Sequence, residues 1–327
     1  MNQSDLKPKL GRDGKPMIGT NGRVMHQLLD PPRLAGKISV WRFVILRRIS
    51  QIGILLLFYG TAHWGWSLAG EPLLSGNLSG SEFAGLIPMA DPFATLQILL
   101  TRAMPETEVL IGAGLILALY ALIAGRVFCA WVCPVNLVTD LAGWLRRRLN
   151  IKDLLHLPRT TRYLVLLAAL LLSAITAVAA FEWISPIGML HRELIYGIGL
   201  GWIAVLGIFI LDLFVIRHGW CGHLCPLGAF YALLGRRSAR LVVTFDTASC
   251  THCGECATVC PEPQVLNLKK LEQAELVSPG ECSACGRCVG SCPEGSLEFH
   301  WSLSRRDGKE PMLSQFSPEI TSQRRSS

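Results

Sequence analysis

The chain has 327 residues, of which 50% are hydrophobic and 17% charged, and its formal net charge is +7. A mean hydropathy of +0.38 is too high for a protein that lies wholly in water, so most of the chain is expected to lie in a membrane. Nucleic-acid binding is not indicated, because the positive charge gathers at the predicted inner membrane face, where anionic lipid accounts for it.

Four apolar stretches follow a polar segment at the start of the chain. Residues 1–38 are polar and contain Gly and Pro, so they are predicted to be a disordered cytoplasmic terminus. A helix needs about 20 residues to cross a ~30 Å hydrocarbon core. Stretches of about this length cover residues 49–68, 109–124, 163–181 and 195–216. Residues 39–240 therefore predict a membrane α-helical domain with four transmembrane helices, the alternative being buried helices of a soluble protein.

Lysine and arginine are unevenly distributed among the connections, and this predicts how the helices are oriented. The segment before the first stretch ends in Arg47 and Arg48, and the connection after the second stretch is rich in arginine. The two opposite connections hold one arginine each, Arg102 and Arg192. Since cytoplasmic connections retain positive charge, both termini and all twelve cysteines are expected on the cytoplasmic side of a bacterial inner membrane.

A short cysteine motif occurs after the second apolar stretch and again after the fourth. Its copies read Cys129-Ala-Trp-Val-Cys133-Pro134 and Cys221-Gly-His-Leu-Cys225-Pro226. Each proline opens an amphipathic segment, 135–145 or 227–234, that ends in arginines and is expected to lie in the inner membrane interface. The membrane domain is thus predicted to be two duplicated hairpins, which would bring the four thiols near one another.

The chemistry of these four thiols is left open by their spacing, because C-x3-C places two sulfurs on one helical face without specifying a ligand. They are candidates for a third metal or cluster site, for reversible disulfides, or for small buried side chains that only pack. The thiols concerned are Cys129, Cys133, Cys221 and Cys225.

The last part of the chain carries two copies of a longer cysteine string, C-x2-C-x2-C-x3-C-P. In proteins with two 4Fe–4S clusters, the fourth cysteine of each such string binds the cluster of the other string. One cluster is therefore predicted on Cys250, Cys253, Cys256 and Cys292. The other is predicted on Cys282, Cys285, Cys288 and Cys260.

Structural zinc is the alternative for these strings, but zinc sites of four cysteines usually have two knuckles separated by a longer stretch. The spacing favours clusters, and therefore an electron carrier. Residues 241–302 are predicted to form a ferredoxin-like domain with two clusters, followed by a disordered tail at 303–327.

The runs Phe128-Cys-Ala-Trp-Val-Cys-Pro134, residues 218–229, and Cys260-Pro-Glu-Pro-Gln264 stand in this order along the chain. Together they resemble the NapH family, the ferredoxin-type membrane subunits of the quinol dehydrogenase that serves periplasmic nitrate reductase. The methylamine-utilisation protein MauN is a close relative. The resemblance covers about residues 40–300 and includes every cysteine motif.

The resemblance implies two 4Fe–4S clusters and the oxidation of membrane quinol. It also implies a periplasmic ferredoxin-type partner similar to NapG, with a tetrahaem cytochrome or the nitrate reductase beyond it. The alternative is an iron–sulfur maturation or regulatory protein, similar to the membrane ferredoxins of cytochrome-oxidase assembly or to MauN. The clusters are expected inside the cell and the acceptor outside, so the route of electrons across the membrane is not evident from the sequence.

Two residues are candidates for taking a proton from quinol. Asp212 is a carboxylate well inside a predicted span, where ionisable groups are costly and usually functional, although it also lies close enough to pair with Arg217. His191 lies with several charged residues in the outer connection between the third and fourth spans, which is alternatively an ordinary solvated loop.

Overall fold

A computed structural model describes residues 6–8, 26–28 and 34–301, except 69, 152, 156, 198, 200, 268–270, 272–275 and 279, and its side chains from Trp41 onward. The strands β1 (Leu6–Pro8) and β2 (His26–Leu28) form an antiparallel pair within the segment predicted to be disordered. The rest of that segment before Leu34, and the predicted tail at 303–327, lie outside the described residues.

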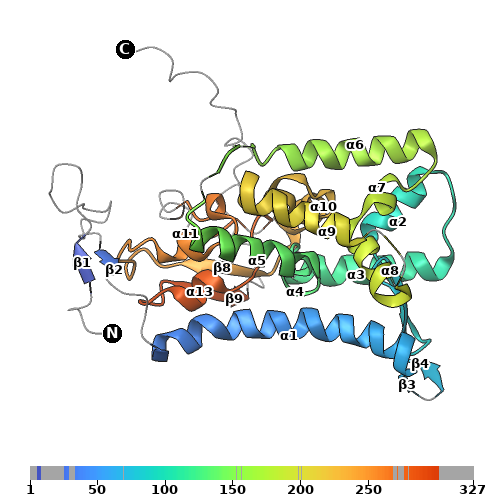
Figure 1. Cartoon of the computed structure of the whole chain (residues 1–327), viewed down its shortest axis with the longest axis horizontal. Helices are drawn as coiled ribbons and strands as arrows, with labels where there is room; N and C mark the ends of the chain where they lie inside the picture. Colours follow the sequence, from blue (N-terminus) through green and yellow to red (C-terminus); the bar gives the residue numbers. More distant parts are fainter. Residues whose placement is uncertain are drawn as a thin grey trace, which may run out of the picture.

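Most of the described chain is a bundle of helices that lie roughly along one axis (Figure 1). The longest, α1 (Leu34–Trp64), runs along one side of the bundle. The others are α2 (Pro92–Leu100), α3 (Thr107–Ile123), α4 (Val127–Trp131), α5 (Val135–Arg148), α6 (Thr161–Thr176), α7 (Ala180–Ile184), α8 (Pro186–Tyr196), α9 (Gly201–Ile210) and α10 (Pro226–Ser238). Two π-helical turns, η2 (Leu211–Val215) and η3 (Trp220–Leu224), connect α9 to α10.

Small antiparallel sheets lie between α1 and α2. Strands β3 (Ser67–Leu68) and β4 (Glu71–Pro72) form one pair. Strands β5 (Leu74–Asn77), β6 (Gly80–Phe83) and β7 (Ile87–Ala90) form a second, three-stranded sheet. β7 packs along α3, where a Cβ on Gly112 would lie 2.9 Å from the Pro88 carbonyl, so glycine permits the close approach.

The four predicted spans correspond to four apolar helices, with different limits. α1 begins before Arg47 and Arg48 and ends before Gly65, whose φ of +66° suits glycine. α3 and α6 begin within two residues of the predicted limits, but α6 stops at Thr176, short of the predicted residue 181. The fourth predicted span includes the end of α8, then α9 and η2.

Within the described residues, one helical segment, Trp41–Trp64, is both long enough and apolar enough to cross a membrane, judged by length and composition. Three further apolar helical segments are shorter: Thr107–Ile123, Thr161–Thr176 and Gly201–Val215. The four-span arrangement therefore stays a prediction.

The structure also repeats itself around the two short cysteine motifs. α3, α4 and α5 carry the first motif, while α9, η2, η3 and α10 carry the second. α10 crosses the end of α3 so closely that a Cβ on Gly125 would lie 2.6 Å from Gly235 Cα, so glycines are needed there. In the other half, α5 packs in the same way, with Gly143 against the ring of His218.

The arginines that close α5 have different surroundings: Arg147 and Arg148 are exposed, whereas Arg146 is not. Arg146 is buried, donating to the carbonyl of Asp212 at 3.0 Å and pairing with Asp153. α10 is packed against α6 and α3, and most of its first two turns are buried. Both helices therefore pack against the bundle with one face, and their position in the membrane interface stays a prediction.

The ferredoxin domain, residues 241–301, lies at the end of the bundle near the start of α1 (Figure 1). Strands β8 (Leu241–Phe245) and β9 (Leu297–Trp301) pair in antiparallel register, Leu241 opposite Trp301, and close the domain. Between them lie α11 (Glu255–Val259), the 3-10 turn η4 (Pro263–Val265) and α13 (Arg287–Ser291). Its core contains Val243, Phe245, Leu266, Val277 and Leu297.

Candidate iron–sulfur sites

Two pockets in the ferredoxin domain are lined by the two sets of cysteines that the sequence predicts. The first pocket is lined by Cys250, Cys253, Cys256 and Cys292, together with Phe245 and Leu297. The second is lined by Cys260, Cys282, Cys285 and Cys288, together with Val243 and Val277. Each pocket thus combines three cysteines of one string with the fourth of the other, which is the arrangement of paired 4Fe–4S clusters.

The two strings have the same backbone geometry. The third residue of each, His252 and Ala284, has a φ of +57° and +50°, and the fifth, Gly254 and Gly286, has a φ of +81° and +74°. These turns point amide groups at sulfur: the N–H of His252 donates to Cys250 Sγ, and the N–H of Ala284 to Cys282 Sγ, both at 3.4 Å. A thiolate that accepts such bonds is suited to hold iron.

A short helix follows each turn and ends at the fourth cysteine. α11 stops before Cys260 and α13 before Cys292, where the following prolines cannot continue a helix. Among the described residues, no three His, Cys, Asp or Glu side chains converge closely enough to hold a single metal ion.

The four thiols of the short motifs lie in the helical bundle. Cys133 and Cys225 are buried in its apolar core, and Cys129 packs against the same cluster of side chains. Cys221 Sγ lies 3.8 Å from Thr139 Oγ1. None of the twelve cysteines forms a disulfide.

Arg126 connects both short motifs to the ferredoxin domain. It lies three residues before Cys129, and its side chain is 1% exposed. Its guanidinium donates to the carbonyl of Cys221 at 3.2 Å, to the carbonyl of Glu281 at 2.8 Å, and to both carboxylate oxygens of Glu262 at 2.7 and 2.8 Å. Glu262 follows Cys260 and Glu281 precedes Cys282, so one side chain touches segments around the second pocket and both thiol motifs.

Two more arginines neutralise the same carboxylates. Arg159 pairs with Glu262 and Glu281, and Arg162, which is fully buried, pairs with Glu281. Tyr163 Oη donates to Glu281 Oε1 at 2.6 Å. Burial alone would raise the pKa of Glu281, but the nearby Arg159 and Arg162 guanidinium groups and the Tyr163 bond lower it to about 2.

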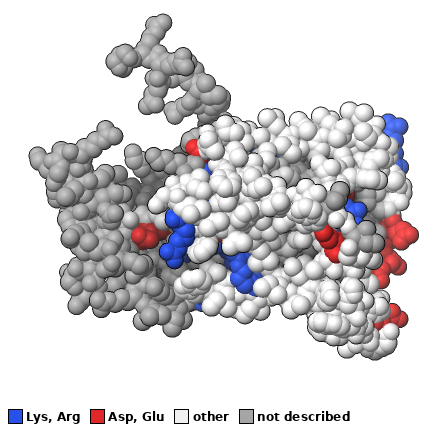
Figure 2. All heavy atoms as spheres, in the orientation of Figure 1, with Lys and Arg blue, Asp and Glu red and all other residues white. Residues whose placement is uncertain are grey.

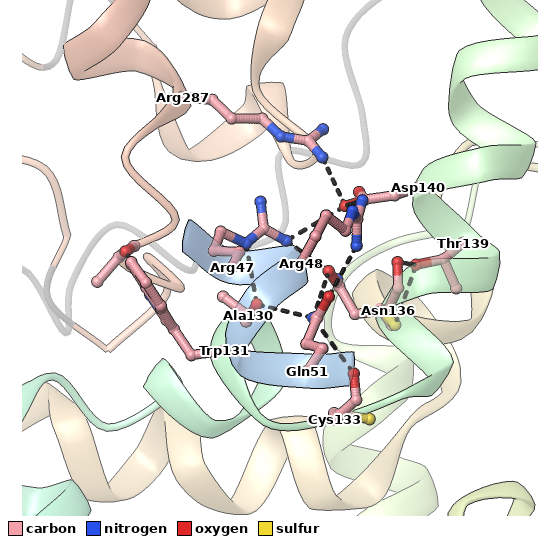
Figure 3. Close-up of polar contacts among 12 residues, drawn as sticks. Arg47, Arg48, Gln51, Ala130, Trp131, Cys133, Asn136, Thr139, Asp140 and Arg287 are labelled. Carbon is pink, nitrogen blue, oxygen red and sulfur yellow. Dashed lines mark hydrogen bonds and ion pairs between the residues drawn. The ribbon is translucent and has the colours of Figure 1, made fainter. Parts of the chain in front are cut away.

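A second connection is centred on Asp140 in α5, whose side chain is 3% exposed (Figure 3). Its Oδ2 accepts from Arg47 at 3.2 Å and from Arg48 and Arg287 at 2.5 Å each. Burial alone would raise the pKa of Asp140, but these guanidinium groups hold it below its usual value. One carboxylate therefore connects α1, α5 and the second cysteine string. We call Asp140, together with Arg47, Arg48 and Arg287, the Asp140 node.

The same part of α1 also holds the first short motif directly. Arg47 Nε and Gln51 Nε2 each donate to the carbonyl of Ala130 at 2.9 Å, and Ser50 Oγ donates to the carbonyl of Trp131 at 2.8 Å. Trp131 in turn donates from Nε1 to the carbonyl of Ala284 at 3.1 Å (Figure 3). The backbone beside Cys129 and Cys133 is thus fixed from both sides.

Comparison with known proteins agrees with this division of the chain. A family model described as "4Fe-4S binding domain" matches residues 107–152 and again 198–243, one match for each short motif. A second, described as "4Fe-4S dicluster domain", matches residues 242–293. The repeated match confirms the predicted internal duplication, and the second match confirms the iron–sulfur domain.

Several named proteins resemble more than two thirds of the chain. It is 41% identical to the ferredoxin-type protein NapH of Haemophilus influenzae, over 73% of this chain and 84% of the relative. It is 42% identical to NapH of Escherichia coli and 44% identical to the methylamine utilization ferredoxin-type protein MauN of Methylorubrum extorquens, each over 71% of this chain and 79% of the relative. The chain belongs to the NapH/MauN family of ferredoxin-type proteins. No solved structure matches it.

Membership of the NapH/MauN family makes the chain an iron–sulfur electron-transfer protein. Of the two residues proposed for quinol, His191 has surroundings that differ from those expected. His191 is 1% exposed in the middle of α8, and its ring stands edge-on to Phe58 with centroids 4.5 Å apart. His191 therefore lies in a helix that packs against α1 and not in a solvated loop, whereas the neighbouring Arg192 is exposed.

Asp212 is fully buried, as expected of a carboxylate inside the bundle, but it does not pair with Arg217. Its Oδ1 accepts from the N–H of Trp220 at 3.0 Å and so holds the two π-helical turns together. Arg217 instead donates to the carbonyls of Thr258 and Cys260, at 3.0 and 2.7 Å. It is therefore a third contact between the bundle and the ferredoxin domain.

Sequence reasoning missed Arg126, Asp140 and Arg287, because their partners lie 92 or more residues away. It also missed Asp91, which caps α2 and accepts from Tyr231 Oη at 3.1 Å. The internal duplication could have pointed to Arg126. If the two short motifs are aligned so that Cys129 matches Cys221, Arg126 matches His218, which is also buried.

Proposed function

We propose that this protein is a membrane-anchored electron carrier that oxidises quinol and passes the electrons toward a periplasmic nitrate reductase system. The family membership supports the iron–sulfur part of this proposal, and the apolar composition supports the membrane part. In the face shown in Figure 2, most of the surface over the helices is uncharged, with a few separate basic and acidic side chains, and a largely uncharged surface suits contact with lipid.

The four bundle thiols are proposed to form a third iron–sulfur centre between the membrane and the ferredoxin domain. Three observations support this: three of the four lie in or against the buried core, all four come from two matched motifs, and both motifs lie in segments similar to an iron–sulfur binding model. When bound, each 4Fe–4S cluster accepts or gives one electron. The thiols that would hold the third one are Cys129, Cys133, Cys221 and Cys225.

The observation that carries the proposal is the direct contact between these motifs and the second pocket. Arg126 bonds to the carbonyl of Cys221 and to both loops that flank the pocket, and Trp131 bonds to the string that lines it. The buried Arg126 and the half-buried Trp131 therefore fix the distance between the bundle thiols and the cysteines of the second cluster. Electron exchange between two centres needs such a fixed distance.

The test uses the purified, anaerobically prepared protein and a short-chain quinol. Stopped-flow absorbance and EPR should show reduction of the clusters by the quinol, with dithionite reduction as a control for intact clusters. The other candidate, a maturation or regulatory protein, predicts that dithionite reduces the clusters while quinol leaves the spectra unchanged. That result would overturn the proposal.

Iron and acid-labile sulfide analysis tests the third centre separately. The wild-type protein should contain about twelve irons, and a Cys129→Ala, Cys133→Ala double variant about eight. About eight irons in both proteins would mean that the bundle thiols hold no cluster. The matched control is Cys292→Ala, which should lose iron from the ferredoxin domain only.

A partner similar to NapG is proposed on the outer side, with a tetrahaem cytochrome or the nitrate reductase after it. This part rests on the resemblance and on the predicted orientation of the helices. Reporter fusions at both ends of the chain should place both termini in the cytoplasm. A reporter that is active only outside the cell would contradict that orientation.

A further inference from the structure

The second pocket is surrounded by arginines that reach it from several elements. Arg217 donates to the Cys260 carbonyl at 2.7 Å and, with Arg159, acts electrostatically on the Cys260 thiol. Arg126 and Arg159 act on the Cys282 thiol in the same way, and Arg47 acts on that of Cys285. Arg287 lies within the string itself, in the first turn of α13.

The carboxylates near the second pocket do not cancel this positive charge. Glu262 and Glu281 face three guanidinium groups, those of Arg126, Arg159 and Arg162. At the Asp140 node, three further guanidinium groups share a single carboxylate oxygen (Figure 3). An excess of positive charge is thus buried beside this pocket.

Two of these buried arginines have a guanidinium nitrogen that donates to no acceptor in the described part of the chain. Arg47 Nη1 and Arg287 Nε are buried and have no hydrogen-bond partner among the described residues. Burying an uncompensated charge is costly, so a nearby anion is expected. A 4Fe–4S cluster with four thiolate ligands carries net negative charge and would serve as that anion.

The first pocket has different surroundings. Its described lining contains no arginine, lysine, aspartate or glutamate, whereas the lining of the second pocket includes Glu262 and Glu281, whose carboxylates are paired with the arginines behind them. The charged side chain that acts on the Cys253 thiol is the Glu255 carboxylate, in the first turn of α11. Glu255 and Arg287 occupy the same position of the two strings, directly before the third cysteine, so the two otherwise similar cluster sites carry opposite charges there.

Adding an electron to a cluster makes it more negative. Buried cations nearby stabilise the reduced form, and a nearby carboxylate destabilises it, because the low dielectric of the interior screens these interactions poorly. We propose that the cluster bound by Cys260, Cys282, Cys285 and Cys288 has the higher reduction potential of the two, and that the Asp140 node sets the difference. Electrons that enter the ferredoxin domain then settle on the cluster beside the helical bundle.

This inference goes beyond the proposed function, because it concerns only the two clusters of the ferredoxin domain and holds whatever the electron donor is. It is tested by an EPR-monitored redox titration of the intact holoprotein. The two clusters should titrate separately. The Cys292→Ser variant, which should lack the first cluster, assigns the signals.

Charge variants then give opposite predictions. Arg287→Gln and Arg48→Gln should each lower the reduced fraction of the second cluster at a fixed ambient potential, whereas Asp140→Asn should raise it. The expected change in the ratio of reduced to oxidised cluster is about tenfold, or 59 mV for one electron. Arg48 is 26% exposed, so its variant is the less disruptive of the two arginine changes. Glu255→Gln is the matched control and should raise the potential of the first cluster alone.

Equal potentials, or a higher potential for the first cluster, would overturn the inference. So would shifts in the same direction for Arg48→Gln and Asp140→Asn, because loss of structure acts alike in both variants whereas charge does not. Arg287→Lys keeps the charge and should restore most of the wild-type potential. Iron content measured on each variant separates a shifted cluster from a lost one.

Discussion

The indole Nε1 of Trp131 donates a hydrogen bond to the carbonyl of Ala284 at 3.1 Å, although 153 residues separate them in the chain. Trp131 lies between Cys129 and Cys133, and Ala284 lies between Cys282 and Cys285. This contact thus joins the cysteine motif of the helical bundle to the string that lines the second pocket.

Trp131→Phe should weaken this junction, because it keeps an aromatic ring and removes the donor, leaving the Ala284 carbonyl without its partner. The expected loss is about 1 kcal/mol, seen as a lower temperature for the disappearance of cluster absorbance on heating. Trp144→Phe is the control, since Trp144 is 50% exposed and should leave the transition unchanged. Equal effects of the two changes would contradict the role of the contact.

Gly286→Ala and Gly254→Ala form a matched pair. Both glycines are the fifth residue of a cysteine string and have left-handed φ, so either substitution should cost on the order of 1 kcal/mol. A Cβ at 286 would also lie 2.4 Å from the ring of Phe43, whereas one at 254 meets nothing within 4 Å. Gly286→Ala should therefore be clearly the more destabilising in thermal unfolding.

Phe43→Ala, added to Gly286→Ala, should recover the extra part of the loss. No recovery would mean that the strain comes from the turn alone and not from packing of α1 against the ferredoxin domain.

The carboxylate of Glu281 predicts how stability depends on pH. Its pKa is held at about 2 in the folded protein against an ordinary value of 4.5, with burial opposing the shift and Arg159, Arg162 and the Tyr163 bond causing it. A lowered folded pKa stabilises the protein above the unfolded value, and this stabilisation is lost as pH falls from about 5 toward 2. Its full size is on the order of 3 kcal/mol.

Thermal unfolding between pH 7 and pH 4 should therefore show a steeper loss of stability for the wild type than for Glu281→Gln. Glu298→Gln, an exposed carboxylate on β9, is the control and should follow the wild-type curve. Parallel curves for wild type and Glu281→Gln would show that the arginines do not hold this carboxylate ionised.

The cluster sites were predictable because their geometry is local and repeated. Three cysteines of each set lie within seven residues, and the duplicated string implies the exchange of the fourth, so spacing alone groups Cys292 with Cys250 and Cys260 with Cys282. The duplication of the short motifs was visible for the same reason. Hydrophobic composition likewise placed α3 and the start of α6 to within two residues.

The contacts between the bundle and the ferredoxin domain were not predictable, because they depend on how distant elements dock. Arg47 and Arg48 were expected to mark a membrane boundary, but they lie inside α1 and bind Asp140, 92 or more residues away. Arg146 was expected to face lipid and is buried. In each case a charged group that composition assigns to the surface is held by a partner that only the tertiary structure supplies.

The central claim is that each cluster of the ferredoxin domain is shared between the two cysteine strings. The most direct test is EPR of the dithionite-reduced Cys292→Ala and Cys260→Ala proteins. Cys292→Ala should abolish the signal of the cluster held by Cys250, Cys253 and Cys256 and keep the other, and Cys260→Ala should do the reverse. The claim would be contradicted if Cys292→Ala lost the cluster held by Cys282, Cys285 and Cys288, and if Cys260→Ala lost the cluster held by Cys250, Cys253 and Cys256.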